Sequence, residues 1–198
     1  MASLGRFIEK RLRLKVNASK SAVARPEERH FLGFRLRRNP EDGTVDVLLS
    51  KRSKERIDQR IRELTPRNWG QSLRDCIRGL NAYLQGWAEF FKICSEAELR
   101  TLRSLDAHIR RRLRAIVLKQ WKRHRTRARR LIQLGVRPKT AWGTIYKRRR
   151  GLWALSHTPA VDRGLRNAFF AERGLIFLAD WFATHQGWAV LALSGTGM

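Results

Sequence analysis

Arginine and lysine side chains gather in one part of the chain, and their chemistry is anion binding rather than catalysis. Between Asp106 and Asp162 the sequence contains no carboxylate. A helix that merely faces water would alternate Glu with Lys or Arg at i,i+4 spacing to limit repulsion between like charges. The cations of this interval are Arg110, Arg111, Arg112, Arg114, Lys119, Lys122, Arg123, Arg125, Arg127, Arg129, Arg130, Arg137, Lys139, Lys147, Arg148, Arg149 and Arg150. We therefore predict contact with an external polyanion.

Three groups of cations are expected to bind nucleic-acid phosphates. The main group lies between Arg110 and Arg130, a weaker group lies on a helix after position 50, and a short run near position 150 suits a groove or a single strand. The predicted binding residues are Lys51, Arg52, Lys54, Arg56, Arg60, Arg110, Arg111, Arg114, Lys119, Lys122, Arg123, Arg125, Arg127, Arg129, Arg130, Lys147, Arg148, Arg149 and Arg150. Charge alone does not distinguish RNA from DNA, because both carry a phosphate backbone.

The composition indicates a folded protein with a nucleic-acid partner. The 198 residues have a formal net charge of +26, and 42% of them are hydrophobic, including seven Trp and nine Phe. That content is enough for a core, whereas the charge favours binding to a polyanion. The apolar stretch 175–193 is interrupted by Asp180, so no membrane span is expected. With two cysteines and no signal-peptide pattern, we expect a reduced, cytoplasmic protein.

Catalytic and metal-binding chemistry is not expected. Two-metal phosphoryl transfer needs clustered carboxylates. Here Glu41 and Asp42 lie in a predicted turn, and Asp58, Asp75 and Asp106 each stand alone on separate predicted helices. The five histidines have no ligand spacing. We therefore predict no metal, no cofactor and no enzymatic activity for the chain by itself.

The N-terminal part of the chain is expected to hold a β-hairpin. Residues 1–15 have the pattern of a short basic helix or a helix end. Residues 30–37 (HFLGFRLR) are aromatic and apolar with a central Gly33, which predicts a strand. NPEDG at 39–43 is a strong turn signal, and residues 45–49 return as a second strand.

The cations are expected to lie on helices. Ser50 is a natural N-cap for a helix over 51–64, and an apolar stripe predicts a second helix over 72–92. A third, long helix is expected over 102–130. A capping box of Ser95 with Glu98 would start it. Three amphipathic helices with short links predict a small bundle.

The C-terminal part is expected to be a smaller helical segment. Gly135 should end the preceding helical stretch. Residues 142–153 look extended or looped. A further helix starts at Pro159 with Ala168 facing inward, and a last apolar helix covers 175–183. The predicted fold class is therefore mainly α, with a short N-terminal β-hairpin, a three-helix bundle and a smaller helical C-terminal segment.

Several stretches, in order, resemble the C-terminal part of bacterial group II intron reverse transcriptase/maturases. VNASKSAVARPEERHFLGFRL starts at Val16, and IRELTPRNWGQSLRDCIRGLNAYLQGWAEFFKI starts at Ile61. LDAHIRRRLRAIVLKQWKR follows from Leu105, and RGLWALSHTPAVDRGLRNAFFAERGL follows from Arg150. The resemblance covers roughly residues 1–183.

The resemblance implies three regions. Residues 1–49 would be the end of the polymerase palm, residues 50–130 the thumb or maturase-specific domain, and residues 131–198 the basic helical segment where the family binds DNA. The residues that resemble the family's VNxxKS and FLGF primer-grip elements are Lys20, Phe31, Leu32, Gly33 and Phe34. With no triphosphate site in the chain, Lys20 is expected to be structural. Packing of the hairpin on the thumb is as well supported as contact with a primer.

The family's fingers and most of its palm are missing, including the YxDD aspartates, which leaves three interpretations open. The chain is an RNA-binding maturase module that clamps structured group II intron RNA and assists splicing. Alternatively, it is the non-catalytic thumb portion of a split reverse transcriptase, with the fingers and palm on another polypeptide, or an inactive remnant of a mobile element. A start at Met1 within the palm favours the remnant. RNA is the implied partner, with DNA or an RNA–DNA hybrid as alternatives, in the bacterial cytoplasm.

Aromatic side chains could add base stacking to these phosphate contacts. Trp87, Phe90 and Phe91 lie on the apolar stripe of the second helix, so core packing is the better prediction for them. Trp69 and Trp142 lie off any clear stripe and are the predicted stacking candidates.

Overall fold

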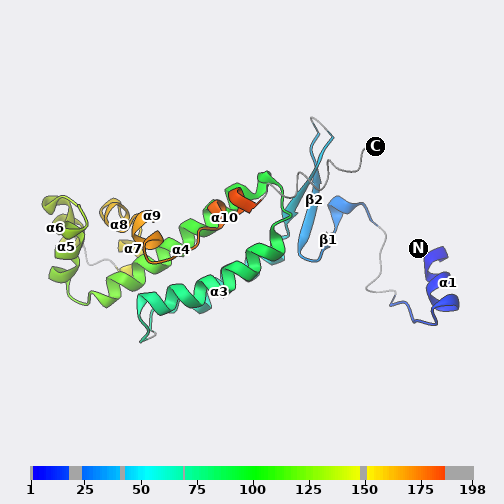
Figure 1. Cartoon of the computed structure of the whole chain (residues 1–198), viewed down its shortest axis with the longest axis horizontal. Coiled ribbons are helices and arrows are strands. Elements are labelled where there is room, and N and C mark those ends of the chain that lie inside the picture. Colours follow the sequence, from blue (N-terminus) through cyan, green and yellow to red (C-terminus); the bar gives the residue numbers. More distant parts are fainter. Residues whose placement is uncertain (1, 18–23, 41–42, 69, 148–150, 186–198) are drawn as a thin grey trace.

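The fold is mainly helical with one small antiparallel sheet, which confirms the predicted fold class. The computed structural model describes residues 2–17, 24–40, 43–68, 70–147 and 151–185. Two long antiparallel helices form the middle of the molecule, the sheet lies at one end, and shorter helices lie at the other (Figure 1). An N-terminal helix, α1 (Ala2–Arg11), lies beyond the sheet.

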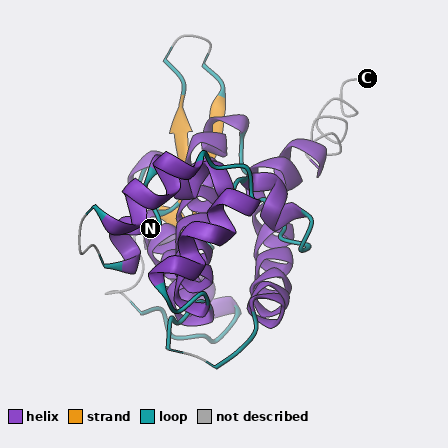
Figure 2. Cartoon of the chain, turned by 90° about the vertical axis from the view of Figure 1, so that its left-hand side faces the viewer, coloured by secondary structure: helices purple, strands orange, loops and turns teal. Residues whose placement is uncertain are grey.

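The sheet has three strands in the order β1, β2, β3. These are β1 (His30–Phe31), β2 (Phe34–Arg38) and β3 (Val45–Leu49), and a 3₁₀ turn, η1 (Pro26–Glu28), precedes them. The β2–β3 hairpin is confirmed, with Phe34 opposite Leu49, and it projects from the bundle in Figure 2. The single strand expected over 30–37 is wrong. The chain reverses at Leu32 and Gly33, which have φ of 50° and 89°.

The predicted three-helix bundle is confirmed. It consists of α2 (Lys51–Leu64), α3 (Leu73–Phe91) and α4 (Leu99–Gln120). Ser50 and Ser72 cap the first two, since their hydroxyls accept from the N–H groups of Ser53 and Asp75. Fully buried side chains from all three helices form the core, among them Ile57, Ile61, Leu80, Leu84 and Leu113.

The long helix expected over 102–130 is wrong. α4 ends at Gln120, Lys122 has a φ of 41°, and α5 (His124–Gln133) starts in a new direction. α5 packs against α6 (Pro138–Tyr146), and Gly135, with a φ of 86°, turns the chain between them. The loop expected over 142–153 is also wrong, because α6 occupies its first part and α7 (Leu152–Leu155) its end.

The remaining helices are short and pack back onto the bundle. They are α8 (Pro159–Gly164), α9 (Asn167–Ala171) and α10 (Leu178–His185). The predicted start at Pro159 is confirmed, but the helix ends at Gly164, so Ala168 lies on α9 and is exposed while Phe170 is buried. A Cβ at Gly164 would lie 2.9 Å from Leu131 Cδ2, so α8 packs closely against α5 at this glycine.

Ser95 and Glu98 fix the sheet to the bundle instead of forming the expected capping box. A 3₁₀ turn, η2 (Glu96–Glu98), precedes α4, and the hydroxyl of Ser95 makes no cap hydrogen bond. The Ser95 hydroxyl accepts from the Val47 N–H at 2.8 Å. The buried Glu98 carboxylate accepts from the Leu49 N–H and pairs with Lys54 Nζ at 2.7 Å. The two side chains thus accept hydrogen bonds from backbone N–H groups on the edge of β3 that does not pair with β2.

Asp106 attaches α10 to α4. Its buried carboxylate accepts from the N–H groups of Leu178 (2.8 Å) and Ala179 (3.0 Å), which lie in the first turn of α10. Burial raises the pKa of Asp106 from 3.8 to about 6, although the two N–H donors oppose this shift. The lone carboxylate noted in the sequence therefore caps a helix.

We expect the Asp106→Ala variant to loosen α10 and to lower the free energy of unfolding by about 2–3 kcal/mol, because two buried N–H groups lose their acceptor. Hydrogen exchange over 178–185 should rise, whereas Asp180→Ala, an exposed change on α10 itself, should leave it unchanged.

Since the folded-state pKa of Asp106 is raised, the folded chain binds a proton more readily than the unfolded chain between about pH 4 and pH 6. The contribution of Asp106 to stability should therefore fall as the pH rises through this window, and Asp106→Asn should abolish that slope.

Candidate nucleic-acid interface

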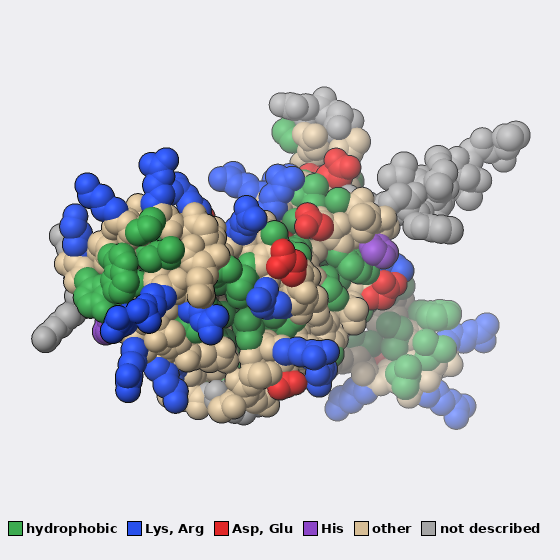
Figure 3. Space-filling view, turned by 60° about the vertical axis from the view of Figure 1, so that its left-hand side comes forward, with side chains coloured by type: hydrophobic (Ala, Val, Ile, Leu, Met, Phe, Trp, Pro, Cys, Tyr) green, Lys and Arg blue, Asp and Glu red, His purple; other side chains and the backbone are tan. Residues whose placement is uncertain are grey.

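The end of the molecule formed by α5 and α6 carries exposed cations on a buried apolar support. Ala128 and Leu131 of α5 and Ala141 and Ile145 of α6 are buried. The exposed cations around them are Lys122, Arg123, Arg125, Arg129, Arg130, Arg137, Lys139 and Lys147. We call these residues the basic surface. Within the described residues, none of them takes part in an ion pair. Lys and Arg side chains project around this end in Figure 3, whereas the acidic side chains in that view lie nearer the sheet.

Three arginines of the basic interval are occupied inside the fold, each at the C-terminal end of a helix. Arg112 donates to the carbonyls of Arg62 and Thr65 at the end of α2. Carbonyls in the last turn of a helix have no partner within it, so a side-chain donor stabilises them.

Arg114 and Arg127 do the same for α8 and α4. Arg114 donates to the Leu165 carbonyl at 2.9 Å and pairs with Asp162 at 2.5 Å. Arg127 Nε donates to the Leu118 carbonyl at 2.7 Å across the break between α4 and α5. Burial lowers the pKa of both guanidinium groups from their usual value. We predicted RNA contact for both residues, and their burial removes them from the interface proposed below.

Other predicted residues of α4 are partly engaged. Arg111 stacks over the Trp153 ring at 4.0 Å, and Arg110 lies 5.8 Å from the centre of the Phe177 ring. Lys119 is exposed and donates to Asn68 Oδ1 at 2.7 Å. Arg110 and Arg111 therefore help to hold the C-terminal helices on α4.

The weaker patch on α2 is largely neutralised by its own carboxylates. Lys54 pairs with the buried Glu98. Lys51 lies 3.9 Å from Glu55, and Arg60 lies 2.9 Å from Glu63. Of the five predicted cations of this patch, Arg52 and Arg56 alone have no ion pair within the described part of the chain.

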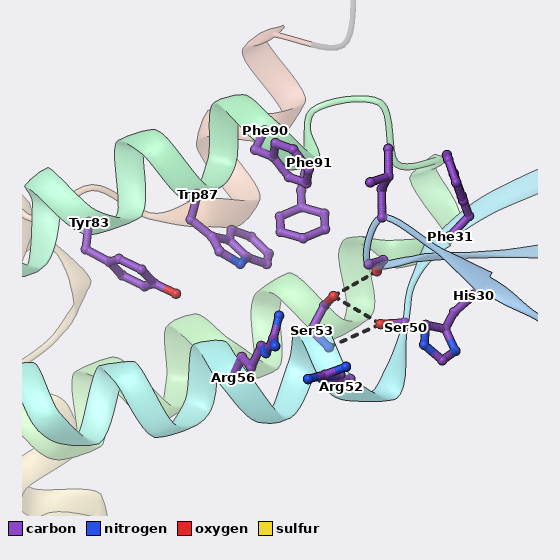
Figure 4. Close-up of a pocket in the computed structure, with 12 residues that line it drawn as sticks. His30, Phe31, Ser50, Arg52, Ser53, Arg56, Tyr83, Trp87, Phe90 and Phe91 are labelled. Atoms are coloured by element: carbon purple, nitrogen blue, oxygen red, sulfur yellow. Dashed lines mark hydrogen bonds between the residues drawn. The ribbon is translucent and has the colours of Figure 1, made fainter. Parts of the chain in front are cut away.

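Arg52 and Arg56 lie instead in a groove of about 630 Å³ between the β1–β2 turn and helices α2 and α3. Tyr83, Trp87 and Phe91 extend from α3 towards Arg56, and His30 and Phe31 lie at the other end (Figure 4). The predicted primer-grip residues Phe31, Leu32 and Gly33 line this groove, while Phe34 packs against the core. We call it the aromatic groove.

The hairpin turn is held rigidly at the groove. The Gly33 carbonyl accepts from the Ser50 N–H and from the Ser53 hydroxyl, both at 2.8 Å. A Cβ at Gly33 would lie 2.7 Å from Ser53 Oγ and 3.3 Å from the Phe91 ring, so glycine is required by contact as well as by its φ of 89°. Of the two roles left open for this hairpin, packing on the following helices is present, and contact with a primer stays a prediction.

The predicted stacking residues fall in different places. Trp142 is partly buried and packs 5.5 Å from the Tyr146 ring. Phe90, which we assigned to the core, is 55% exposed at the aromatic groove. On α3, Phe90 lies about 100° around the helix axis from the buried Phe91, which places it at the edge of the apolar stripe, where a side chain can stay exposed. The predicted residues Lys20, Trp69, Arg148, Arg149 and Arg150 lie outside the described residues.

Comparison with protein families identifies the bundle. Residues 54–134 match the family model of the group II intron maturase-specific domain. This match covers less than half of the chain. The resemblance drawn from the sequence is thereby confirmed for this stretch, and the chain is consistent with a fragment of a group II intron maturase. A search of characterised proteins found no match for it.

The stretch that matches the family model runs from the first turn of α2 through α3 and α4 to the end of α5. It therefore includes the break at Lys122 and the exposed arginines of α5, whereas α6 lies beyond it. In the described ranges no group of three or more His, Cys, Asp or Glu side chains is placed to hold a metal ion. None of the helices described is long and apolar enough to cross a bilayer.

Proposed function

We propose that this protein is a non-catalytic RNA-binding module that clamps structured group II intron RNA and so assists its splicing. The basic surface carries the proposal: eight exposed cations on α5, α6 and the adjoining turns, without a carboxylate partner in the described residues. Such a surface binds phosphates without reading sequence, and its fixed shape selects folded RNA.

The position of the maturase-specific domain supports RNA over DNA as the partner. The domain match includes α5, which supplies Arg125, Arg129 and Arg130 to the basic surface. The capping arginines Arg114 and Arg127 hold α5 and α8 on α4, so the cations above them are presented on a rigid support. Pre-organised phosphate contacts cost less ordering entropy than contacts from a flexible tail.

The RNA, rather than the protein, would perform the splicing chemistry. Three carboxylates have structural roles instead: Asp106 caps α10, Glu98 fixes β3, and Asp162 pairs with Arg114. We therefore propose that primer extension by the purified chain is undetectable.

A splicing assay tests this proposal. At a Mg²⁺ concentration where a group II intron transcript splices poorly alone, adding the purified chain should raise the spliced fraction. A transcript of equal length without the intron fold should compete weakly. If the spliced fraction stays unchanged while the RNA is fully bound, assistance in splicing is contradicted although binding stands.

The N-terminal region favours a second candidate, the thumb portion of a split reverse transcriptase. α1 and the residues after it expose Leu4, Phe7, Leu12 and Leu14, each more than half accessible. Exposed apolar side chains in such number are typical of a protein-binding surface. If the chain is such a thumb portion, a polypeptide with the family's fingers and palm should bind it, and the mixture should show primer-extension activity that neither protein has alone. No gain on mixing would rule it out.

A further inference from the structure

We propose that the aromatic groove holds one unpaired nucleotide of the RNA that the basic surface binds. The base lies against Phe90 and Leu32, and its phosphate lies against Arg52 and Arg56. This inference rests on the proposed function and adds to it a second contact of different chemistry. A volume of about 630 Å³ is in the range of small-molecule sites and leaves room for one nucleotide.

Phe90 provides an accessible ring on a rigid support. It is 55% exposed. It packs on Phe34, with ring centres 5.8 Å apart and planes 21° from parallel, and on Phe91 at 4.8 Å. Trp87 and Phe91 are buried and hold these rings in place. A fixed aromatic face is what an unpaired base stacks on, and such stacking tolerates any base.

Leu32 points to a ligand independently. It has a φ of 50°, which favours Asn or Gly and strains a bulky side chain. Its side chain is 66% exposed, so it gains little burial from folding. The β1–β2 turn requires this backbone conformation but no bulky apolar side chain, and an exposed leucine kept at a strained position is typical of a binding site. Because Gly33 is fixed to Ser50 and Ser53, Leu32 is held at the edge of the groove.

The charges of the groove select a nucleotide over an apolar ligand. Arg52 and Arg56 line it and have no ion pair within the described residues, unlike Lys51, Lys54 and Arg60 on the same helix. An aromatic wall facing two guanidinium groups matches a base joined to a phosphate.

Two RNA hairpins test the inference with the full chain. One is a perfect duplex, and the other carries a single bulged 2-aminopurine. The wild-type chain should bind the bulged hairpin about tenfold more tightly, with a change in 2-aminopurine fluorescence. Phe90→Ala should remove this preference. Phe7→Ala is the matched control, because Phe7 is 54% exposed but lies on α1, and it should keep the preference.

Leu32→Asn keeps the test decisive if Phe90→Ala unfolds. Asn suits the φ of this position, so the variant should melt at a higher temperature than the wild type and yet lose most of the preference. If Leu32→Asn and Phe90→Ala are folded and keep the full preference, or if the wild type binds both hairpins equally, the inference is wrong. In either case the proposed function is judged separately. If replacing cations of the basic surface weakens RNA binding, the proposed function stands even though this inference has failed. Salt-independent binding of both hairpins would instead overturn the proposed function.

Discussion

The quadruple variant Arg123→Gln, Arg125→Gln, Arg129→Gln and Arg130→Gln should bind structured RNA roughly 100-fold more weakly at about 0.1 M salt. These residues are exposed on α5 and the turn before it, and no carboxylate in the described residues offsets their charge. Each lost cation removes a phosphate contact and the counterion release that goes with it. Filter binding with a fixed intron RNA measures the loss.

A charge-matched control separates a local contact from a general effect of net charge. Arg6, Arg29, Arg100 and Arg103 are also exposed, but they lie on α1, before β1 and in the first turns of α4. Replacing these four by Gln lowers the net charge by the same amount and should weaken binding by less than about threefold. Equal losses in the two variants would mean that binding follows the overall charge and that the basic surface has no special role.

Arg114→Ala should lower the free energy of unfolding by about 2–4 kcal/mol, although its position in the sequence suggests a surface cation. The side chain is 7% exposed, and its removal leaves the Leu165 carbonyl without its donor and opens space between α4 and α8. Lys should not rescue this loss, because an ammonium group does not reproduce the planar donors of a guanidinium. Chemical denaturation measures the effect.

Asp162→Asn provides the comparison for this variant. The Asp162 side chain is 65% exposed, so the ion pair itself should contribute less than about 1 kcal/mol, and most of the Arg114 effect should persist in its absence. If Arg114→Ala kept its full stability but bound RNA weakly, Arg114 would belong to the interface and the assignment to a helix cap would be wrong.

Local signals predicted the regular elements well and their interruptions poorly. Ser50 and the stripe that follows it gave α2 its observed bounds, because capping and periodicity are properties of neighbouring residues. The end of α4 has no Gly or Pro to mark it. At this break Lys122 has a positive φ, Arg127 donates to the Leu118 carbonyl, and α5 packs against α6. Such a break depends on tertiary contacts that a one-dimensional pattern does not contain.

The same limit applies to the interface. The exposed cations of the basic surface lie within the interval between Asp106 and Asp162, whose lack of carboxylates can be read from the sequence alone. Which arginines remain free depends on where helices end. Arg125 and Arg127 differ by two positions, yet one is exposed and the other donates to a backbone carbonyl.

The salt dependence of RNA binding tests the central claim most directly. If the basic surface engages six or more phosphates, the affinity of the wild-type chain for a structured intron RNA should fall by about 10³-fold or more between roughly 50 and 200 mM salt. A plot of log affinity against log salt should be linear, and the quadruple α5 variant should have a shallower slope. An affinity that stays constant over this range would contradict binding through phosphate contacts.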